Sequence, residues 1–375
     1  MSRPDSAWRL GYVPALDGLR ACAVAVVVML HAGLGFARGG GLGVDVFFVL
    51  SGFLITSLLL QEFADHGRLR MKRFYMRRVL RLVPALAFML AFTLLLAAVA
   101  PLHLPPAFDA GTVGQAAIIA FLYLSDVTVA FTHENIGPLL HTWSLSVEEH
   151  FYLLWPVALV LMLRRAWSWQ RIAAALAIAI VAIAGWRVIV YESGGRLFHV
   201  LYSFDTQADH LLAGCLLAVA MPAIAGRLQA RRQVLGPVAL AAFATLAAVV
   251  VAAPSAQQLV LGGYPLILVS SIVVVSYLVS GPVTGPLRLL ESAPFVYVGR
   301  LSYAIYLWHY VVFHALTTEA LGTSKPVSIA IRLLLALGLS MLSYHVVEQR
   351  FLRLKNRRWE PPDRSGDVAR PAVAA

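Results

Sequence analysis

Two ionisable side chains interrupt the first long apolar stretch of the chain. Residues 16–33 read LDGLRACAVAVVVMLHAG, so Arg20 and His31 both stand inside a segment apolar enough to lie in lipid. At 100° per residue their separation of eleven positions returns to one helix face, about 16 Å further along the axis. A charge near the middle of a bilayer costs roughly 2.5–3.5 kcal/mol. We therefore expect Arg20 and His31 to line a functional site within the membrane.

Two acids are candidates to act with His31. Asp45 opens the apolar stretch GVDVFFVLSGFLIT after a short Gly-rich turn, which would place its carboxylate near His31. There it would fix the tautomer of the imidazole and leave the other nitrogen as a general base. A first-turn acid favoured by the helix dipole is the other reading of Asp45. Glu148, in HTWSLSVEEHFYLLWP, is the second candidate, because the capping box formed by Ser146 and Glu149 gives it no structural role.

A basic cluster precedes the third long apolar stretch. In MKRFYMRRVLRLVP, Arg77 and Arg81 are four residues apart and share a helix face, with Arg78 beside them. Guanidinium groups match phosphate geometry, so the cluster could hold a polyanionic donor that arrives from the cytoplasm. Topology and anionic lipid headgroups also favour charge at this position.

Four further side chains are candidates for binding the acceptor. In FDTQADHLLAG, Asp205 and Asp209 share a helix face, where they would bind a hydroxylated ligand or cap the helix. His309, in GRLSYAIYLWHY, is another ionisable group within an apolar segment and needs a partner there. Trp143 fits an acceptor site or the aromatic belt of the membrane interface equally well.

Composition decides the class of protein. The 375 residues are 60% hydrophobic and only 13% charged, with a mean hydropathy of +0.77. Apolar stretches of about 18–22 residues recur, each long enough to cross a hydrocarbon core of about 30 Å. We therefore predict an all-α, polytopic membrane protein in contact with the lipid bilayer. The net charge of +11 lies mostly in loops, as the positive-inside rule requires, so no nucleic-acid partner is expected.

The basic loops predict the topology. Residues 65–82, 164–171, 226–232 and the segment from Arg350 onward are basic, and they share one side only if 112–131 does not cross. That stretch is also poorly suited to face lipid, because it contains polar residues such as Gln115 and Asp126. We predict ten crossings and two cytoplasmic termini, with 112–131 in or along the outer half. The candidate stretches are 15–36, 43–64, 83–100, 112–131, 147–163, 172–192, 204–221, 235–252, 260–280, 299–317 and 327–347.

The sequence predicts one integral-membrane domain over residues 1–355 and a disordered cytoplasmic tail over 356–375, which is rich in Pro, Arg and Asp. Cys22 and Cys215 lie in apolar segments and indicate neither a disulfide nor a metal site. Motifs typical of zinc, nucleotide or dinucleotide binding are missing, so no metal and no permanently bound cofactor are expected.

These segments in this order resemble the bacterial integral-membrane acyltransferase family 3. The resemblance runs from about residue 12 to 355 and rests on LDGLRACAVAVVVMLH, GVDVFFVLSGFLIT, RRVLRLVP, HTWSLSVEEHFYLLWP, FDTQADHLLAG, GRLSYAIYLWH and SYHVVEQRFLRL. It implies a ten-helix bundle of the bacterial inner membrane that moves an acyl group, commonly acetyl from acetyl-CoA, to a hydroxyl of an extracytoplasmic carbohydrate. It also implies roles for several of the residues named above: Arg20 and His31 as essential groups, Arg77, Arg78 and Arg81 in handling the donor, and Glu148.

Two departures from the family pattern limit what can be carried over. Gln207 stands where the family usually has an arginine, so no charged role is transferred there. Glu348 is followed by Gln349 and Arg350, where the family usually reads Glu-Arg-Pro. Many relatives also append a soluble hydrolase-like domain, which this sequence does not include.

The expected mechanism uses both basic residues of the first helix, Arg20 and His31. Acyl-CoA would dock its phosphates on the arginine cluster and extend its pantetheine arm past Arg20. The thioester would then meet an acceptor hydroxyl, whose proton His31 takes. A transporter or channel with buried Arg and His along its path is the alternative, and an acyl exporter without transferase chemistry is a third. The acceptor, the acyl group and the oligomeric state are not specified by the sequence.

Overall fold

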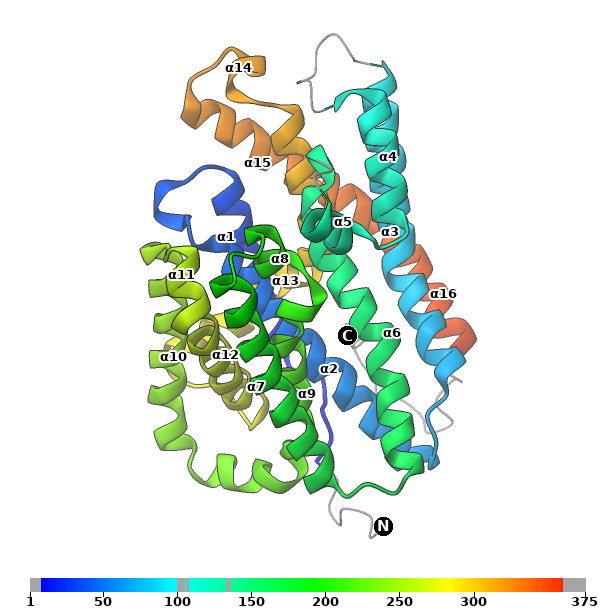
Figure 1. The fold of residues 1–375 in the computed structure, drawn as a ribbon, viewed down its shortest axis with the longest axis vertical. Coiled ribbons are helices and arrows are strands. Elements are labelled where there is room, and N and C mark those ends of the chain that lie inside the picture. The colour runs from blue at the N-terminus through cyan, green and yellow to red at the C-terminus, as the bar shows by residue number, and fades with distance from the viewer. Residues whose placement is uncertain (1–7, 100–104, 106–107, 133–135, 360–375) are drawn as a thin grey trace.

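The computed structural model describes residues 8–99, 105, 108–132 and 136–359. Every regular element in these ranges is a helix, which confirms the predicted fold class (Figure 1). The long α-helices are α1 (Pro14–His31), α2 (Gly43–His66), α3 (Met71–Val99), α6 (Trp143–Arg164), α7 (Trp169–Glu192), α9 (Phe204–Ala230), α10 (Arg232–Ala252), α12 (Tyr264–Val279), α13 (Ala293–Ala315) and α15 (Lys325–Leu342).

Shorter helices connect the long ones. The short α-helices are α4 (Ala110–Phe121), α5 (Ser125–Phe131), α8 (Leu197–Tyr202), α11 (Ala256–Gln258), α14 (Thr318–Leu321) and α16 (Gln349–Trp359). The 3₁₀ turns are η1 (Gly35–Ala37), η2 (Gly40–Leu42), η4 (Gly137–Thr142) and η6 (Gly285–Glu291). The π-helical turns are η5 (Leu259–Gly263) and η7 (Ser343–Glu348). Residues 356–359 of the predicted tail continue α16, and the rest of that tail lies outside the described residues.

Within the described ranges, nine helical segments are long and apolar enough to cross a membrane, or ten if the bent pair α4 and α5 counts as one span. That pair bends by 118°, and both helices stay in the upper part of Figure 1. The nine do not include α13, whose histidines, tyrosines and Arg300 lower its hydropathy. At 1.5 Å per residue α13 is about 35 Å long, enough to cross. Ten crossings therefore result when α13 spans and α4–α5 is re-entrant.

The basic connections gather at one end of the bundle. The α2–α3, α6–α7 and α9–α10 connections lie together at the lower end of Figure 1, opposite α4 and α14. They include Arg68, Arg70, Arg165 and Arg231. This is the arrangement that the positive-inside rule requires of loops on the cytoplasmic side.

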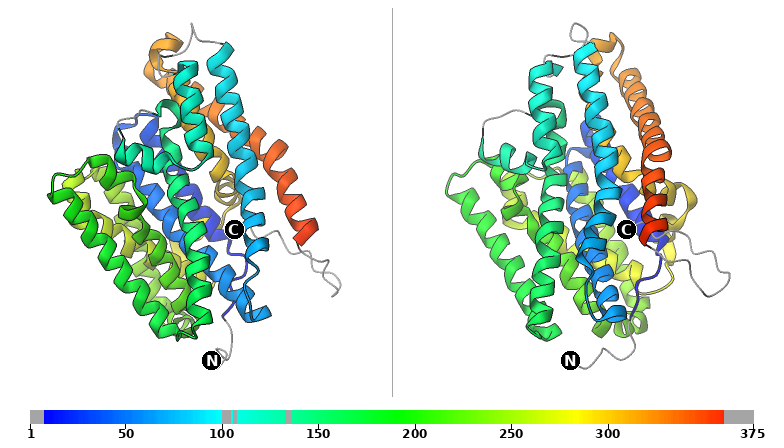
Figure 2. Two further views of the ribbon diagram at one scale, coloured as in Figure 1. Left: turned by 45° about the vertical axis from the view of Figure 1, so that its right-hand side comes forward. Right: turned by 90° about the vertical axis from the view of Figure 1, so that its right-hand side faces the viewer.

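Close helix contacts hold α1 and α2 in the middle of the bundle, between α3 with α15–α16 on one side and α7–α12 on the other (Figure 2). A Cβ added to Gly52 of α2 would lie 1.9 Å from the Leu211 carbonyl oxygen of α9. A Cβ added to Gly299 of α13 would lie 1.9 Å from the Asp17 carbonyl oxygen of α1. Glycine thus lets these backbones approach closely, as small residues do between membrane helices.

Candidate active site

A cavity opens between α1, α2, α3, α6 and α13. It encloses about 80 Å³, which is room for roughly five to eight water molecules. Phe47, Phe48 and Leu54 give it an apolar side on α2, while its charged groups come from three other helices. Its polar lining comprises Arg20, Ser51, Arg78, Arg81, Ser144, Glu148, Tyr152, Ser302, Tyr303 and Tyr306.

The cavity brings Arg20 together with two arginines that lie 58 or more positions later in the sequence. Arg20 of α1, which is 9% exposed, lines the same space as Arg78 and Arg81 of α3. The Arg78 guanidinium lies 3.8 Å above the centre of the Tyr152 ring, a cation–π geometry that holds the side chain in place. Arg77 is not among the lining residues. The two arginines of α3 that face the cavity, Arg78 and Arg81, are therefore three positions apart. The sequence pattern instead emphasised Arg77 and Arg81, which are four positions apart.

Two glutamates lie close to these arginines. Glu148 lines the cavity, and the Ser51 hydroxyl donates a hydrogen bond of 2.5 Å to its Oε1. Glu348, at the end of the π-helical turn η7, is 6% exposed and interacts electrostatically with Arg81 and Arg20. Sequence reasoning selected Glu148 but not Ser51 or Glu348. Single π-helical turns often mark functional positions, but they are visible only in the folded chain.

A cluster of histidines lies at the far end of α1. His31 is the last residue of that helix, and its Nδ1 lies 3.2 Å from Nε2 of His309 on α13. Nδ1 of His309 lies 3.0 Å from the Ile305 carbonyl oxygen. The Tyr310 ring meets His31 edge-on, with 4.9 Å between ring centres. The same ring stacks on His314, 4.0 Å away.

His141 joins this cluster from the turn η4. Its ring stacks on Tyr310 with 4.8 Å between centres, and lies 5.9 Å from the His309 ring. His141 is 3% exposed. His141 was not among the site candidates selected from the sequence, although a histidine one threonine away from WSLSVEE, at the start of an apolar helix, was a usable signal.

One tyrosine connects the cavity to the histidines. Tyr306 lines the cavity, and its hydroxyl donates to the His141 carbonyl oxygen at 2.8 Å. The same hydroxyl lies 2.6 Å from the Ser144 hydroxyl, which also faces the cavity. The Tyr306 ring centre lies 5.5 Å from that of His309. The Tyr306 side chain therefore lies between the cavity and the histidine cluster.

The structure places Asp45 and Asp209 in a separate buried group. Asp209 forms an ion pair with Arg187 and a 3.1 Å contact with Nδ1 of His210, all three side chains being almost fully buried. Asp45, which is 6% exposed, interacts electrostatically with His210 and Arg187. The contacts shown by the described residues for His31 are with α13 and its own helix instead.

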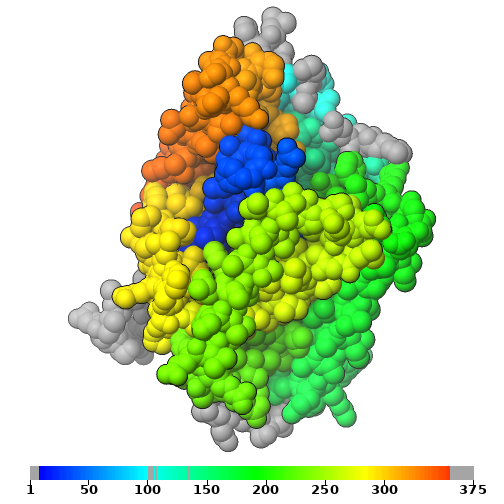
Figure 3. Space-filling model, turned by 90° about the vertical axis from the view of Figure 1, so that its left-hand side faces the viewer, coloured from blue at the N-terminus to red at the C-terminus, as the bar shows by residue number. Residues whose placement is uncertain are grey.

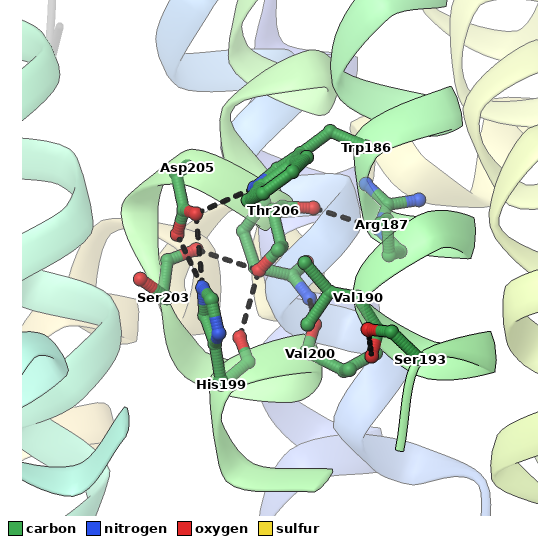
Figure 4. A network of polar contacts seen from close by, with 10 residues as sticks. Trp186, Arg187, Val190, Ser193, His199, Val200, Ser203, Asp205 and Thr206 are labelled. Carbon is green, nitrogen blue, oxygen red and sulfur yellow. Dashed lines mark hydrogen bonds and ion pairs between the residues drawn. The ribbon is translucent and has the colours of Figure 1, made fainter. Parts of the chain in front are cut away.

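Asp205 and Trp143 contact residues outside the His31–His309 pair. Asp205 accepts a 2.7 Å hydrogen bond from Trp186 Nε1 and lies 2.9 Å from His199 Nε2 (Figure 4). Its side chain is 41% exposed, so it can still be reached from outside. Trp143 packs against Tyr202, with 4.8 Å between ring centres. Gln207, where the family pattern has an arginine, donates to the Val200 carbonyl oxygen at 2.9 Å and links α9 to α8.

The surface near His31 is formed by the connection to α2. Residues 33–42 lie between α10–α12 and α14–α15 on the face shown in Figure 3. Phe36 in this connection is 58% exposed, whereas His31 is partly buried. In the part of the chain that the structure describes, no group of three or more potential ligands is arranged to hold a metal ion.

The sequence profile of a family described as an acyltransferase domain matches residues 13–345. The chain belongs to this acyltransferase family. Three bacterial relatives are similar over most of its length. YrhL of Bacillus subtilis is 33% identical over 354 residues, covering 90% of this chain and 54% of that protein. Peptidoglycan O-acetyltransferase OatA of Listeria monocytogenes is 32% identical over 334 residues, covering 84% and 51%.

O-acetyltransferase OatA of Staphylococcus aureus is 29% identical over 343 residues, covering 90% of this chain and 57% of that protein. The chain thus spans about half the length of these relatives. No solved structure matches it. The family match agrees with the resemblance found in the sequence and establishes the chain as part of a family of multi-pass membrane acyltransferases.

Proposed function

We propose that the protein transfers an acetyl group from acetyl-CoA to a hydroxyl of a cell-wall glycan on the outer side of the bacterial inner membrane. The observation that carries this proposal is the position of Tyr306 between a cavity lined by three arginines and the pair formed by His31, at the end of α1, and His309 of α13. The phosphates of a donor bind best at the end of the site that carries the arginines. An acceptor hydroxyl needs a general base, which the histidines offer at the other end of the site. The names of the relatives support peptidoglycan as the glycan.

Arg78 and Arg81 bind the phosphates of acetyl-CoA in this proposal, since guanidinium groups pair with phosphate oxygens in two-pronged geometry. The basic loops at the same end support a cytoplasmic entry for the donor and cytoplasmic termini. Arg20 lies further along the same space and holds the arm of the donor. About 16 Å along α1 separates Arg20 from His31, and the flexible arm bridges this distance.

His31 acts as the general base. The acceptor oxygen attacks the thioester carbonyl carbon while its proton moves to His31, and a C–O bond forms. The tetrahedral intermediate then expels the sulfur of CoA, the C–S bond breaks, and His31 returns the proton to that sulfur. Glu148, held by Ser51, keeps the arginines oriented within the cavity. Acetyl-CoA is a co-substrate here, and no resident cofactor is needed.

The acceptor approaches from the end that carries α4, α8 and α14. Of the acids proposed to bind it, Asp205 is the one with an exposed carboxylate beside a tryptophan, Trp186, that is 45% exposed. Aromatic rings and carboxylates together suit a sugar, because one covers its apolar face and the other accepts from its hydroxyls. Asp209 is committed to Arg187 and His210 instead.

The decisive experiment uses the purified protein in nanodiscs, radiolabelled acetyl-CoA and peptidoglycan fragments. We expect label in the glycan with the wild-type protein, its loss in His31→Ala, and retention in His314→Ala. The last variant is a matched control, because His314 lies in the same cluster and its Nδ1 bonds to the Tyr310 carbonyl rather than to His31. Donor binding without transfer would favour an acyl exporter, and neither binding nor transfer would favour a transporter.

A further inference from the structure

We propose that His309 is a positioning residue for His31: it fixes which nitrogen of His31 carries the proton, and so makes Nε2 the base. This inference rests on the proposed function, in which His31 accepts the proton of the acceptor hydroxyl. It reassigns His309, which the sequence analysis placed among the acceptor-binding residues. It also assigns to His309 the role of fixing the His31 tautomer, which the sequence pattern assigned to Asp45.

The position of the hydrogen on His309 follows from a neighbouring group that can only accept a hydrogen bond. The Ile305 carbonyl oxygen lies 3.0 Å from Nδ1 of His309, so Nδ1 must carry the hydrogen. A neutral imidazole has one N–H and one lone pair. Nε2 of His309 therefore presents its lone pair, and it does so 3.2 Å from Nδ1 of His31.

The hydrogen between the two rings must then belong to His31. With Nδ1 of His31 as the donor, Nε2 of His31 has the free lone pair that a general base needs.

The surroundings of His309 keep it neutral. Its side chain is fully buried, and its ring neighbours are Tyr306, Tyr310, Phe313 and His141. These rings carry no negative charge, so a second proton on His309 would be an uncompensated charge in an apolar setting. The pair therefore resembles the base and orienting group of a catalytic triad, with a neutral acceptor in place of the carboxylate.

The same hydrogen bond also acts during the reaction. When the acceptor proton reaches Nε2, His31 becomes an imidazolium whose Nδ1–H donates to His309. That charge-assisted bond stabilises the positive charge at the moment it forms. The contribution therefore belongs to the chemical step and not to substrate binding, which gives it a distinct kinetic signature.

The test compares His309→Leu, His309→Gln and His309→Asn with His314→Leu as the matched control on the same helix. The leucine variant has no acceptor, whereas the amide oxygen of glutamine reaches the position of Nε2 and that of asparagine does not. We expect His309→Leu to lower kcat by about 10²–10⁴-fold, the usual contribution of acid–base catalysis. The KM values of donor and glycan should change little, and His314→Leu should keep the wild-type kcat.

Rescue by glutamine decides the role of the acceptor. We expect His309→Gln to be at least about tenfold faster than His309→Asn, which corresponds to about 1.4 kcal/mol. Equal rates for these two variants would overturn the proposal, and so would a leucine variant with the wild-type kcat. This comparison also decides the matter if the leucine variant does not fold.

Two further outcomes separate this inference from the proposed function. An increase in the glycan KM of His309→Leu with an unchanged kcat would overturn the positioning role and restore acceptor binding. If His31→Ala transfers acetyl at the wild-type rate, the proposed function fails first, whatever the His309 variants do. If His31→Ala is inactive and His309→Leu is not, only the inference fails.

Discussion

The ion pair between Arg187 and Asp209 offers a direct test of what the acids of α9 do. Their side chains are 1% and 2% exposed, and Arg187 also donates to the Thr206 carbonyl oxygen at 2.6 Å. The structure gives this pair a role in holding α7 against α9. The sequence analysis gave Asp209 a role in binding the acceptor. The two roles predict different results for the same variants.

We expect Arg187→Met to be destabilised by about 3–5 kcal/mol, because Asp209 would stay buried without its main counter-charge. This amounts to roughly 10²–10⁴ in the folding equilibrium constant, at 1.4 kcal/mol for each factor of ten. The double variant Arg187→Met, Asp209→Asn should recover most of that loss, because no buried charge is left unpaired. Arg171→Met, an exposed position on the same helix, should stay within about 0.5 kcal/mol of the wild type.

The assay is reversible unfolding of the purified protein in mixed micelles, analysed as a double-mutant cycle, together with the glycan KM of each folded variant. A double variant as unstable as the single one would refute the reasoning from charge pairing. A stable double variant with a strongly raised glycan KM would show instead that Asp209 binds the acceptor. A stable double variant with normal kinetics is the result we expect.

Further predictions concern the cavity and the helix packing. Arg78→Gln should raise the KM for acetyl-CoA by about 10–100-fold, through the loss of charge-assisted hydrogen bonds worth roughly 1.5–3 kcal/mol, whereas Arg77→Gln should change that KM little. Ser51→Ala leaves a partly buried Glu148 oxygen without its donor and should lower kcat/KM by about 5–100-fold; full activity would contradict this. Gly52→Ala would place a Cβ 1.9 Å from a carbonyl oxygen of α9, so size-exclusion chromatography should show a lower yield of folded protein, at a cost of about 1–3 kcal/mol. Matched substitutions at exposed loop positions should leave that yield unchanged.

The sequence alone predicted what depends on one helix at a time. Hydropathy and basic loops indicated a polytopic helical bundle, which the structure confirms, and predicted that 112–131 does not cross the membrane. The structure bends that segment by 118° between α4 and α5, and its not crossing stays a prediction. The angle of 100° per residue predicts that Arg20 and His31 share one face of one helix. These inferences depend only on composition and on the backbone geometry of a single helix.

Which helices meet was decided only by the tertiary structure. His31 contacts His309, 278 positions away, and Asp45 lies near Arg187 and His210 rather than near His31, although it is close to His31 in sequence. The orientation of α3 directs Arg78 and Arg81 into the cavity and leaves Arg77 off its lining.

The physical reason is that most long helices among the described residues are strongly apolar, and lipid tails are as apolar as leucine side chains. Hydrophobicity therefore shows that a helix crosses the membrane but does not select its neighbours. Close contacts at Gly52 and Gly299, and buried polar pairs such as His31 with His309, make that selection. Such contacts exist only between residues far apart in the sequence, so they become visible once the helices are packed.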